Sequence, residues 1–209
     1  LTFSVPKSVS VVYALGDPLV QQAVVEGCEA ALAEALAWLE REAPSYLVTY
    51  PNNAAALIAE IEDQGTELPD LLELGTLGEV LPAGLRESCR RVLGVPLVDA
   101  YSTVELGYLA LQCPEHEHYH VQSEHVFVEI LRDDGAPCAI GESGRVVATA
   151  LHAFAMPLIR YELGDYATVG APCPCGRGLP VLDRILGRAR NMLRLPDGDV
   201  LWPRYGTPV

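Results

Sequence analysis

The chain has 209 residues, of which 50% are hydrophobic, and a formal net charge of −14. Its length and hydrophobicity allow a substantial buried core, which excludes an intrinsically disordered protein. The negative charge argues against nucleic acid or an anionic membrane surface as the main partner, because both are bound through basic surfaces. No apolar run is long enough to span a bilayer and "LTFSVPKSVS" shows no signal peptide, so we expect a cytoplasmic protein.

The first hundred residues alternate between helix and strand patterns. Asp17 and Pro18 predict a helix start, which an Ala/Leu/Glu-rich run continues to residue 42. The next elements are a strand at "SYLVTY", a helix over residues 54–63 capped by Asn52 or Asn53, a strand in "DLLELGTLGE", a helix in "PAGLRESCRRVLG" and a strand at "VPLVDAY". This alternation predicts an α/β fold with a parallel sheet.

After Tyr108 the hydrophobic pattern changes. The stretch "HVFVEILRDDGAPCAIGESGRVVATAL" alternates with period two around a Gly/Asp/Pro-rich connection. Further strands and turns are expected in "MPLIRYELGDYATVG" and "RILGRARNMLRLPDG". The second part of the chain is therefore predicted to be β-rich and antiparallel.

Three stretches carry candidate binding chemistry. "YSTVELG" follows a strand, where α/β sheets bind ligands, and offers Tyr101 to a base and Glu105 to a hard cation. In "PLIRYELGDYATVG" a strand leads into a tight glycine turn, after which Asp165 can accept two hydrogen bonds from a ribose diol. "LGRARNMLRLPDG" offers Arg188 to a phosphate or a ribose. Taken one at a time, the first two stretches are more simply ordinary polar turns, and the third could equally be a basic hairpin.

Taken together and in this order, the three stretches resemble the adenylate-forming acyl-CoA synthetase superfamily. Its corresponding motifs read Tyr-Gly-x-Thr-Glu, Arg-Tyr-x-x-Gly-Asp and Gly-Arg-x-Asp-Asp-x-hydrophobic. "MPLIRYELGD" and "CPCGRGLP" resemble its phenylacetate–CoA ligase and capsule-biosynthesis branch nearly letter for letter. The resemblance extends from about Trp38 to Gly198 and implies a parallel sheet with helices followed by a β-rich subdomain, as in part of the large N-terminal domain of these enzymes.

The same resemblance implies an organisation and a reaction. The resemblance divides the chain into an α/β subdomain (1–108), a β-rich subdomain with a zinc site (109–186), and a hinge with the start of a truncated C-terminal lid (187–209). A carboxylic acid, expected to be aryl, and Mg-ATP would give an acyl-adenylate, whose acyl group passes to coenzyme A. By position, Glu105 would hold magnesium, Asp165 the ribose hydroxyls, and Arg188 would approach the ribose or a phosphate. The residues expected to border the adenine are Gly78, Glu79, Tyr101, Ser102 and Thr103.

The chain departs from the family pattern at several positions. Ser102 and Val104 replace a glycine and a threonine, and Arg190 replaces the hinge acid. We find neither the Ser/Thr/Gly-rich phosphate loop nor the lid with its lysine, so we expect the second half of a catalytic core. Three alternatives stay open: transfer to an amine or a carrier protein, a catalytically inactive nucleotide-binding module, and a scaffold domain without a nucleotide site. The resemblance also permits a homodimer.

The stretch "LQCPEHEHYHVQSEH" holds four of the five histidines. Some members of the same branch resemble the chain in a Cys-x6-His segment and a later Cys-x-Cys-Gly segment. The matching residues are Cys113, His120, Cys173 and Cys175. Three thiolates and one imidazole would form a closed structural zinc site. His116 and His118 also have acceptable spacing, and only the family register favours His120.

Overall fold

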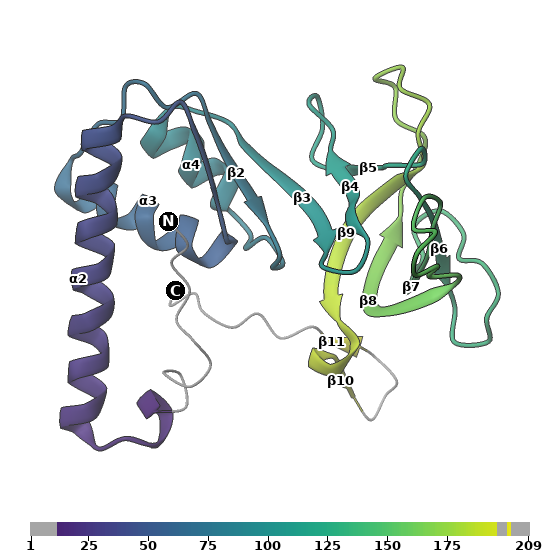
Figure 1. Cartoon of the computed structure of the whole chain (residues 1–209), viewed down its shortest axis with the longest axis horizontal. Helices are drawn as coiled ribbons and strands as arrows, with labels where there is room; N and C mark the ends of the chain where they lie inside the picture. The colour runs from purple at the N-terminus through teal and green to yellow at the C-terminus, as the bar shows by residue number, and fades with distance from the viewer. Residues whose placement is uncertain (1–11, 196–199, 202–209) are drawn as a thin grey trace. The chain divides into compact units, whose positions relative to one another are not determined.

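The computed structural model describes residues 12–195 and 200–201. Its elements are α2 (Pro18–Glu42), β1 (Tyr46–Thr49), α3 (Pro51–Gln64), β2 (Glu73–Leu77), α4 (Leu85–Leu93), β3 (Leu97–Thr103), β4 (Gly107–Gln112), β5 (Tyr119–Val121), β6 (Val126–Leu131), β7 (Ser143–Ala150), β8 (Tyr161–Val169), β9 (Val181–Arg188), the 3₁₀ helix η1 (Ala189–Asn191), β10 (Leu193–Arg194) and β11 (Val200–Leu201) (Figure 1). Among the described helices, none combines the length and apolar character needed to cross a membrane.

The chain divides into two compact units. The first contains the residues up to Thr76 together with Leu81–Leu97, and the second contains Leu77–Val80 and the residues from Val98 onward. Part of the expected segment 187–209 lies outside the described residues. The boundaries expected at residues 108 and 186 stay predictions.

The first unit is an α/β structure, as its sequence predicts. Strands β1 and β2 pair in parallel, with Tyr46 opposite Glu73. Helices α3 and α4 pack beside them (Figure 1). The shared core consists of Ala54, Ile58, Leu71, Leu74, Leu85, Cys89, Val95 and Leu97. Helix α2 adds Ala35 and Leu39 against Leu57 of α3. Each helix thus contributes one apolar face to this core.

Helix α2 begins where its sequence predicts. The Asp17 carboxylate accepts hydrogen bonds from the backbone N–H groups of Leu19 and Val20, both at 3.0 Å. Pro18 occupies the first turn, where its missing N–H costs no hydrogen bond. Ala43 ends the helix in the left-handed conformation.

The predicted cap of α3 is wrong. The helix begins at Pro51 with Tyr50 at the N-cap, and no side chain caps it. Proline fixes φ at a helical value and is favoured at the first position, so Asn52 and Asn53 lie inside the first turn. The Asn53 amide instead donates to the Thr49 hydroxyl at 3.4 Å.

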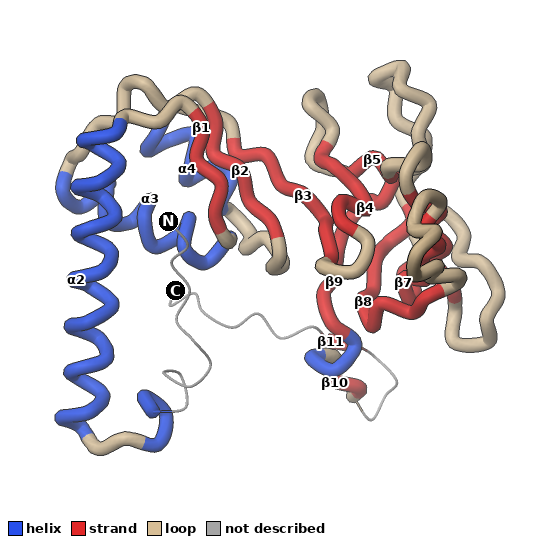
Figure 2. The backbone as a smooth tube through the Cα atoms, in the orientation of Figure 1, coloured by secondary structure: helices blue, strands red, loops and turns tan. Residues whose placement is uncertain are grey.

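The second unit is antiparallel and β-rich, which confirms the change of pattern after residue 108 (Figure 2). Its strands follow the order β3-β4-β5-β9-β8-β7-β6. The core includes Leu106, Leu109, Ala110, Val121, Val126, Val146, Ala148, Leu163, Ala167 and Leu182. Segments far apart in the sequence, such as β5 and β9, therefore become neighbours.

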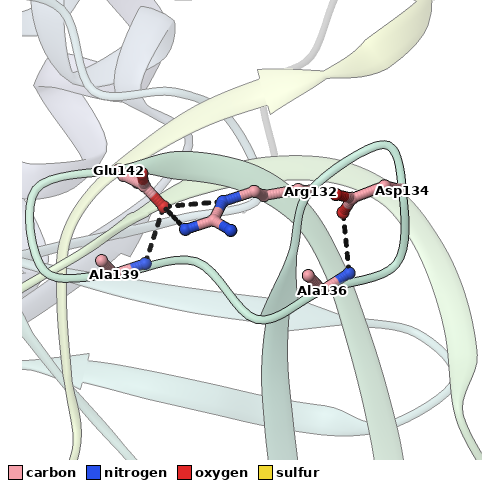
Figure 3. Close-up of polar contacts among 5 residues, drawn as sticks. All are labelled: Arg132, Asp134, Ala136, Ala139 and Glu142. Atoms are coloured by element: carbon pink, nitrogen blue, oxygen red, sulfur yellow. Dashed lines mark hydrogen bonds and ion pairs between the residues drawn. The ribbon is translucent and has the colours of Figure 1, made fainter.

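The connection between β6 and β7 is held by its own polar side chains (Figure 3). The Glu142 carboxylate forms an ion pair with Arg132 at 2.7 Å and accepts the Ala139 N–H at 2.8 Å. The Asp134 carboxylate accepts the Ala136 N–H at 2.9 Å, which closes a tight turn. These bonds account for Asp134 and Glu142 of this loop without a ligand.

Candidate functional site

The motif "YSTVELG" is divided between a strand and a turn. Strand β3 continues through Thr103, so Tyr101–Thr103 lie within the strand, whereas the sequence predicts that they follow it. The chain then turns, and the Thr103 hydroxyl accepts the Leu106 N–H at 3.1 Å. Glu105 lies in this turn, exposed to solvent. Its carboxylate is thus accessible to a cation.

Asp165 is positioned by a β-bulge within β8, which corrects the predicted turn after the strand. The pairing with β7 shifts register between Arg145 and Val147, where β8 passes Gly164. Gly164 has a φ of +73°, a conformation that residues with a Cβ rarely adopt. A bulge redirects the side chains next to it, so the Leu-Gly-Asp sequence turns Asp165 without ending the strand.

Buried Asp165 and Tyr101 form a polar group with Arg188, whose side chain is half exposed. The Tyr101 hydroxyl donates to Oδ2 of Asp165 at 2.8 Å, and Nε of Arg188 lies 3.1 Å from Oδ1. Nη1 of Arg188 also donates to the Leu163 carbonyl at 2.6 Å. Asp165 is only 6% exposed, so its charge is paired rather than hydrated.

The electrostatics of this group keep Tyr101 protonated. Burial, followed by the charge of Asp165 and the hydrogen bond to it, raises the pKa of Tyr101 far above its ordinary range. The phenol therefore acts as a donor. An ionised carboxylate has about four acceptor positions, of which these partners use two, so Asp165 retains capacity for further donors.

The segment that contains Gly78 and Glu79 lies beside β9. Gly187 has a φ of +102°, and a Cβ there would lie 2.9 Å from Cγ2 of Val80. Gly187 directly precedes Arg188, so Val80 packs next to the residue that pairs with Asp165. The structure thus places Gly78 and Glu79 in the same unit as Tyr101, Asp165 and Arg188.

The four expected metal ligands gather in one place. The donor atoms of Cys113, His120, Cys173 and Cys175 all lie within 4.8 Å of one another. The sulfurs of Cys113 and Cys173 are 3.8 Å apart, and Cys175 Sγ is 3.3 Å from Nε2 of His120. A tetrahedral zinc site has ligand separations of ~3.8 Å between sulfurs and ~3.6 Å between sulfur and nitrogen, given its usual bond lengths. Among the described residues this is the one such group, and it contains neither His116 nor His118.

Pairing between strands brings the two ligand segments together. Cys113 follows β4, and its N–H donates to the His118 carbonyl at 2.8 Å. His120 lies on β5, opposite Val181 of β9. The loop from β8 to β9 carries Cys173 and Cys175. The β5–β9 ladder therefore places this loop next to His120.

The pKa shifts favour the metal-binding protonation state at two of the four expected ligands, His120 and Cys175. Burial lowers the pKa of His120, with the charge of His118 acting in the same direction, so the imidazole is neutral. The backbone N–H of Arg177 lowers the pKa of Cys175 and favours its thiolate. Burial raises the pKa of Cys173 to about 11. A metal would have to displace that proton, because only thiolates are good ligands.

The sequence does not predict one buried pair. The Tyr119 hydroxyl donates to Oδ2 of Asp99 at 2.6 Å, and Asp99 is 4% exposed. The Asp99 N–H donates to the side chain of Gln112 at 2.9 Å. Tyr119 precedes His120, and Asp99 lies two residues before Tyr101 on the same side of β3. An aspartate inside the apolar strand "VPLVDAY" is the signal that could have identified this link between the two sites.

A sequence profile described as TrwC relaxase matches residues 1–55. This segment is about a quarter of the 209 residues. All the candidate site residues, from Gly78 onward, lie outside it, so the match assigns no activity to them.

Curated relatives match a larger part of the chain. The phenylacetate-coenzyme A ligase of Thermus thermophilus is 32% identical over 158 residues, which are 72% of this chain and 35% of the relative. The enzyme of the same name from Escherichia coli K12 is 31% identical over 157 residues, which are 72% of this chain and 36% of the relative. The chain thus spans about a third of the length of these relatives.

Solved structures share the fold. A 2-hydroxyisobutyryl-CoA ligase in complex with its acyl-AMP in the postadenylation state has a TM-score of 0.72 at 21% identity, over 82% of this chain and 38% of that one. The anthranilate CoA ligase AuaEII in complex with anthranoyl-AMP has a TM-score of 0.67 at 19% identity, over 82% of this chain and 35% of that one. Sequence and fold therefore agree, and the chain is a homologue of the phenylacetate-coenzyme A ligases within the adenylate-forming superfamily.

Proposed function

We propose that the chain supplies part of the nucleotide site of an enzyme that activates a carboxylic acid with ATP and transfers the acyl group to coenzyme A. The observation that carries this proposal is the polar group of Tyr101, Asp165 and Arg188, formed around the buried Asp165 carboxylate by residues at the matching motif positions. The names of the curated relatives and the acyl-AMP bound to the structural neighbours support it.

Each residue has a role that its environment suits. Asp165 would accept the two ribose hydroxyls with its remaining acceptor positions, and Arg188 would orient that carboxylate while its guanidinium approaches the nucleotide. Since the Tyr101 hydroxyl is bound to Asp165, the ring rather than the hydroxyl is left to border the adenine. Such fixed charges suit a reaction at phosphorus, where catalysis is mainly positioning and charge stabilisation.

Two metals belong to the proposal. Glu105 would hold Mg²⁺, which when bound offsets the charge of the phosphates. Cys113, His120, Cys173 and Cys175 would hold a structural zinc ion, since their donor chemistry and spacing fit a closed tetrahedral site. Gly78, Glu79, Ser102 and Thr103 would border the adenine.

We infer an aryl or otherwise apolar acid as the substrate, which rests on the names of the relatives. Coenzyme A is the acceptor that the names of the relatives favour. Because ATP and coenzyme A are intracellular metabolites, we propose a cytoplasmic location. The expected homodimer stays a prediction.

The test is a calorimetric titration of the protein with AMP, using the variant Asp165→Asn. Asparagine keeps the shape and can still accept from Tyr101, but it loses the charge and one set of acceptors. We expect AMP affinity to fall about 10- to 100-fold, the value of one or two charged hydrogen bonds. Asp134→Asn, in the β6–β7 connection, is the matched control and should bind AMP as the wild type does.

AMP binding that is equally strong in Asp165→Asn would remove the ribose assignment. Turnover is then measured on the full-length protein by acid-dependent exchange between ATP and pyrophosphate. Adding coenzyme A should release AMP and the acyl thioester. Exchange without transfer to coenzyme A would keep the adenylation step and redirect the search to an amine or a carrier protein.

A further inference from the structure

The turn that carries Glu105 has little support on its solvent side. Val104 is fully exposed, at 102%, and Gly107 ends the turn with a φ of +69°. Inside the turn, the Thr103 hydroxyl accepts the Leu106 N–H. A carboxylate that is to bind a cation must be held in place beforehand, so the question is what fixes the rest of this turn.

His125 provides the second attachment. Its Nε2 lies 2.8 Å from the carbonyl oxygen of Leu106, which is the residue after Glu105. A carbonyl can only accept, so Nε2 carries the hydrogen and donates it. A Cβ on Gly107 would lie 3.8 Å from the same nitrogen, so the ring lies directly against the end of the turn.

The backbone that carries this ring is itself fixed. The His125 N–H donates to the Gln122 carbonyl at 2.9 Å, and its own carbonyl accepts the Leu151 N–H at 3.1 Å. Val126, the next residue, is fully buried at the start of β6. The imidazole is therefore mounted on a rigid part of the second unit, while the turn that it holds is exposed.

We propose that His125 is a positioning residue for Glu105: its ring N–H fixes the Leu106 carbonyl and thereby the carboxylate that would face the magnesium-bound phosphates. This inference rests on the proposed function of the site. His125 itself does not touch the nucleotide. Its effect is therefore specific to the magnesium-dependent part of binding and spares the ribose contact of Asp165.

His152 offers a matched comparison. Its Nε2 lies 2.8 Å from the Glu124 carbonyl, a bond of the same kind and length, and its ring is 6.4 Å from that of His125. This bond ties the segment before β6 to the chain after β7 and does not reach the turn. Loss of either imidazole removes one ring-to-backbone hydrogen bond, but only His125 contacts the residues around Glu105.

The experiment compares His125→Ala, His125→Gln and His152→Ala. The amide nitrogen of glutamine occupies nearly the position of Nε2, so His125→Gln keeps the donor. Hydrogen exchange of the Leu106 amide, without nucleotide, should be ~3- to 10-fold faster in His125→Ala. This factor corresponds to the net free energy of one hydrogen bond. The affinity for ATP with Mg²⁺ should fall by a similar factor. AMP affinity without Mg²⁺ should not change, His125→Gln should restore both values, and His152→Ala should match the wild type.

Two results overturn the proposal. One is that His125→Ala leaves either the hydrogen-exchange rate of the Leu106 amide or the affinity for Mg-ATP unchanged, in a protein whose wild type binds AMP. The other is an equal effect of His152→Ala, which would show a general loss of stability. If the wild type itself does not bind AMP, the proposed function fails first, and that outcome is visible before any variant is measured.

Discussion

Asp165 is the residue on which both stability and proposed binding depend. Its carboxylate is buried, and two partners neutralise or hydrogen-bond it. A buried charge is tolerated only with such partners, so Tyr101 and Arg188 are required before any ligand arrives. The same partners leave lone pairs free, which is what a nucleotide site needs.

At this scale we predict the effect of Tyr101→Phe. The phenol is the donor to Oδ2 of Asp165, and a hydrogen bond to a charged group contributes about 1.5–3 kcal/mol. The free energy of unfolding in urea should fall by about this amount. The control is Tyr108→Phe, an exposed position on β4, where a change below about 0.5 kcal/mol is expected. Equal effects of both substitutions would contradict the role of this hydrogen bond.

The pH dependence gives a second measurement on the same variant. Since the folded pKa of Tyr101 lies above its ordinary value of 10.0, the unfolded state loses the phenolic proton first as the pH rises. The stabilisation from Tyr101 is therefore complete below pH 10.0 and decreases above it. The difference in the free energy of unfolding between the wild type and Tyr101→Phe should therefore decrease only in that alkaline range.

The sequence identifies these residues but not their contact. Tyr101 and Asp165 are 64 positions apart, and only the register of β3, β4, β5, β9 and β8 brings them together. Local pattern gives each of them no more than a polar turn. What points to them is the order of the motifs along the chain, which resembles the order in the adenylate-forming superfamily.

Glycines decide how several elements of the second unit meet. Gly144, near the start of β7, lies against the backbone of Leu131 at the end of β6. A Cβ on Gly144 would overlap the Leu131 carbonyl and lie 2.5 Å from Sγ of Cys138. Gly164 forms the bulge beside Asp165. The alternating pattern predicts the strands, but a bulge depends on the partner strand and cannot be read from one segment. For the same reason the pattern predicts a turn where β8 continues.

We predict opposite effects for two alanine substitutions, one in β7 and one in α2. Gly144→Ala should lower the free energy of unfolding by about 1–3 kcal/mol, because the backbone of Leu131 cannot move aside easily. Gly27→Ala, inside α2 with open space around it, should raise stability by about 0.5–1 kcal/mol, since alanine loses less entropy in a helix. Chemical denaturation of both variants checks the sign. A stable Gly144→Ala would show that the β6–β7 hairpin is less tightly packed than described.

The whole chain has two units with different means of stabilisation. The first is held by apolar helix faces on a short parallel sheet. The second is an antiparallel structure that also contains the Cys/His group between β4, β5 and the β8–β9 loop. The hydrophobic pattern of the sequence predicts this change from α/β to β-rich. The resemblance selected His120 among three histidines, because spacing alone allows each of them, and the strand ladder explains why His120 faces the cysteines.

The last prediction concerns the metal and the second unit. The purified protein should contain one zinc ion per chain, and Cys175→Ser should lose it, because a hydroxyl is a poor substitute for a thiolate ligand. Cys28→Ser is the control: this cysteine is exposed on α2 and should keep the zinc. Loss of the ion should lower Tm by ~4–8 °C, which corresponds to about 2 kcal/mol in a chain of this size. Hydrogen exchange should become faster in the loops around Cys113 and Cys173 but not in α3, which belongs to the first unit. Full zinc content in Cys175→Ser would remove the metal assignment, whereas loss of zinc without faster exchange would show that the strand ladder holds these loops without the ion.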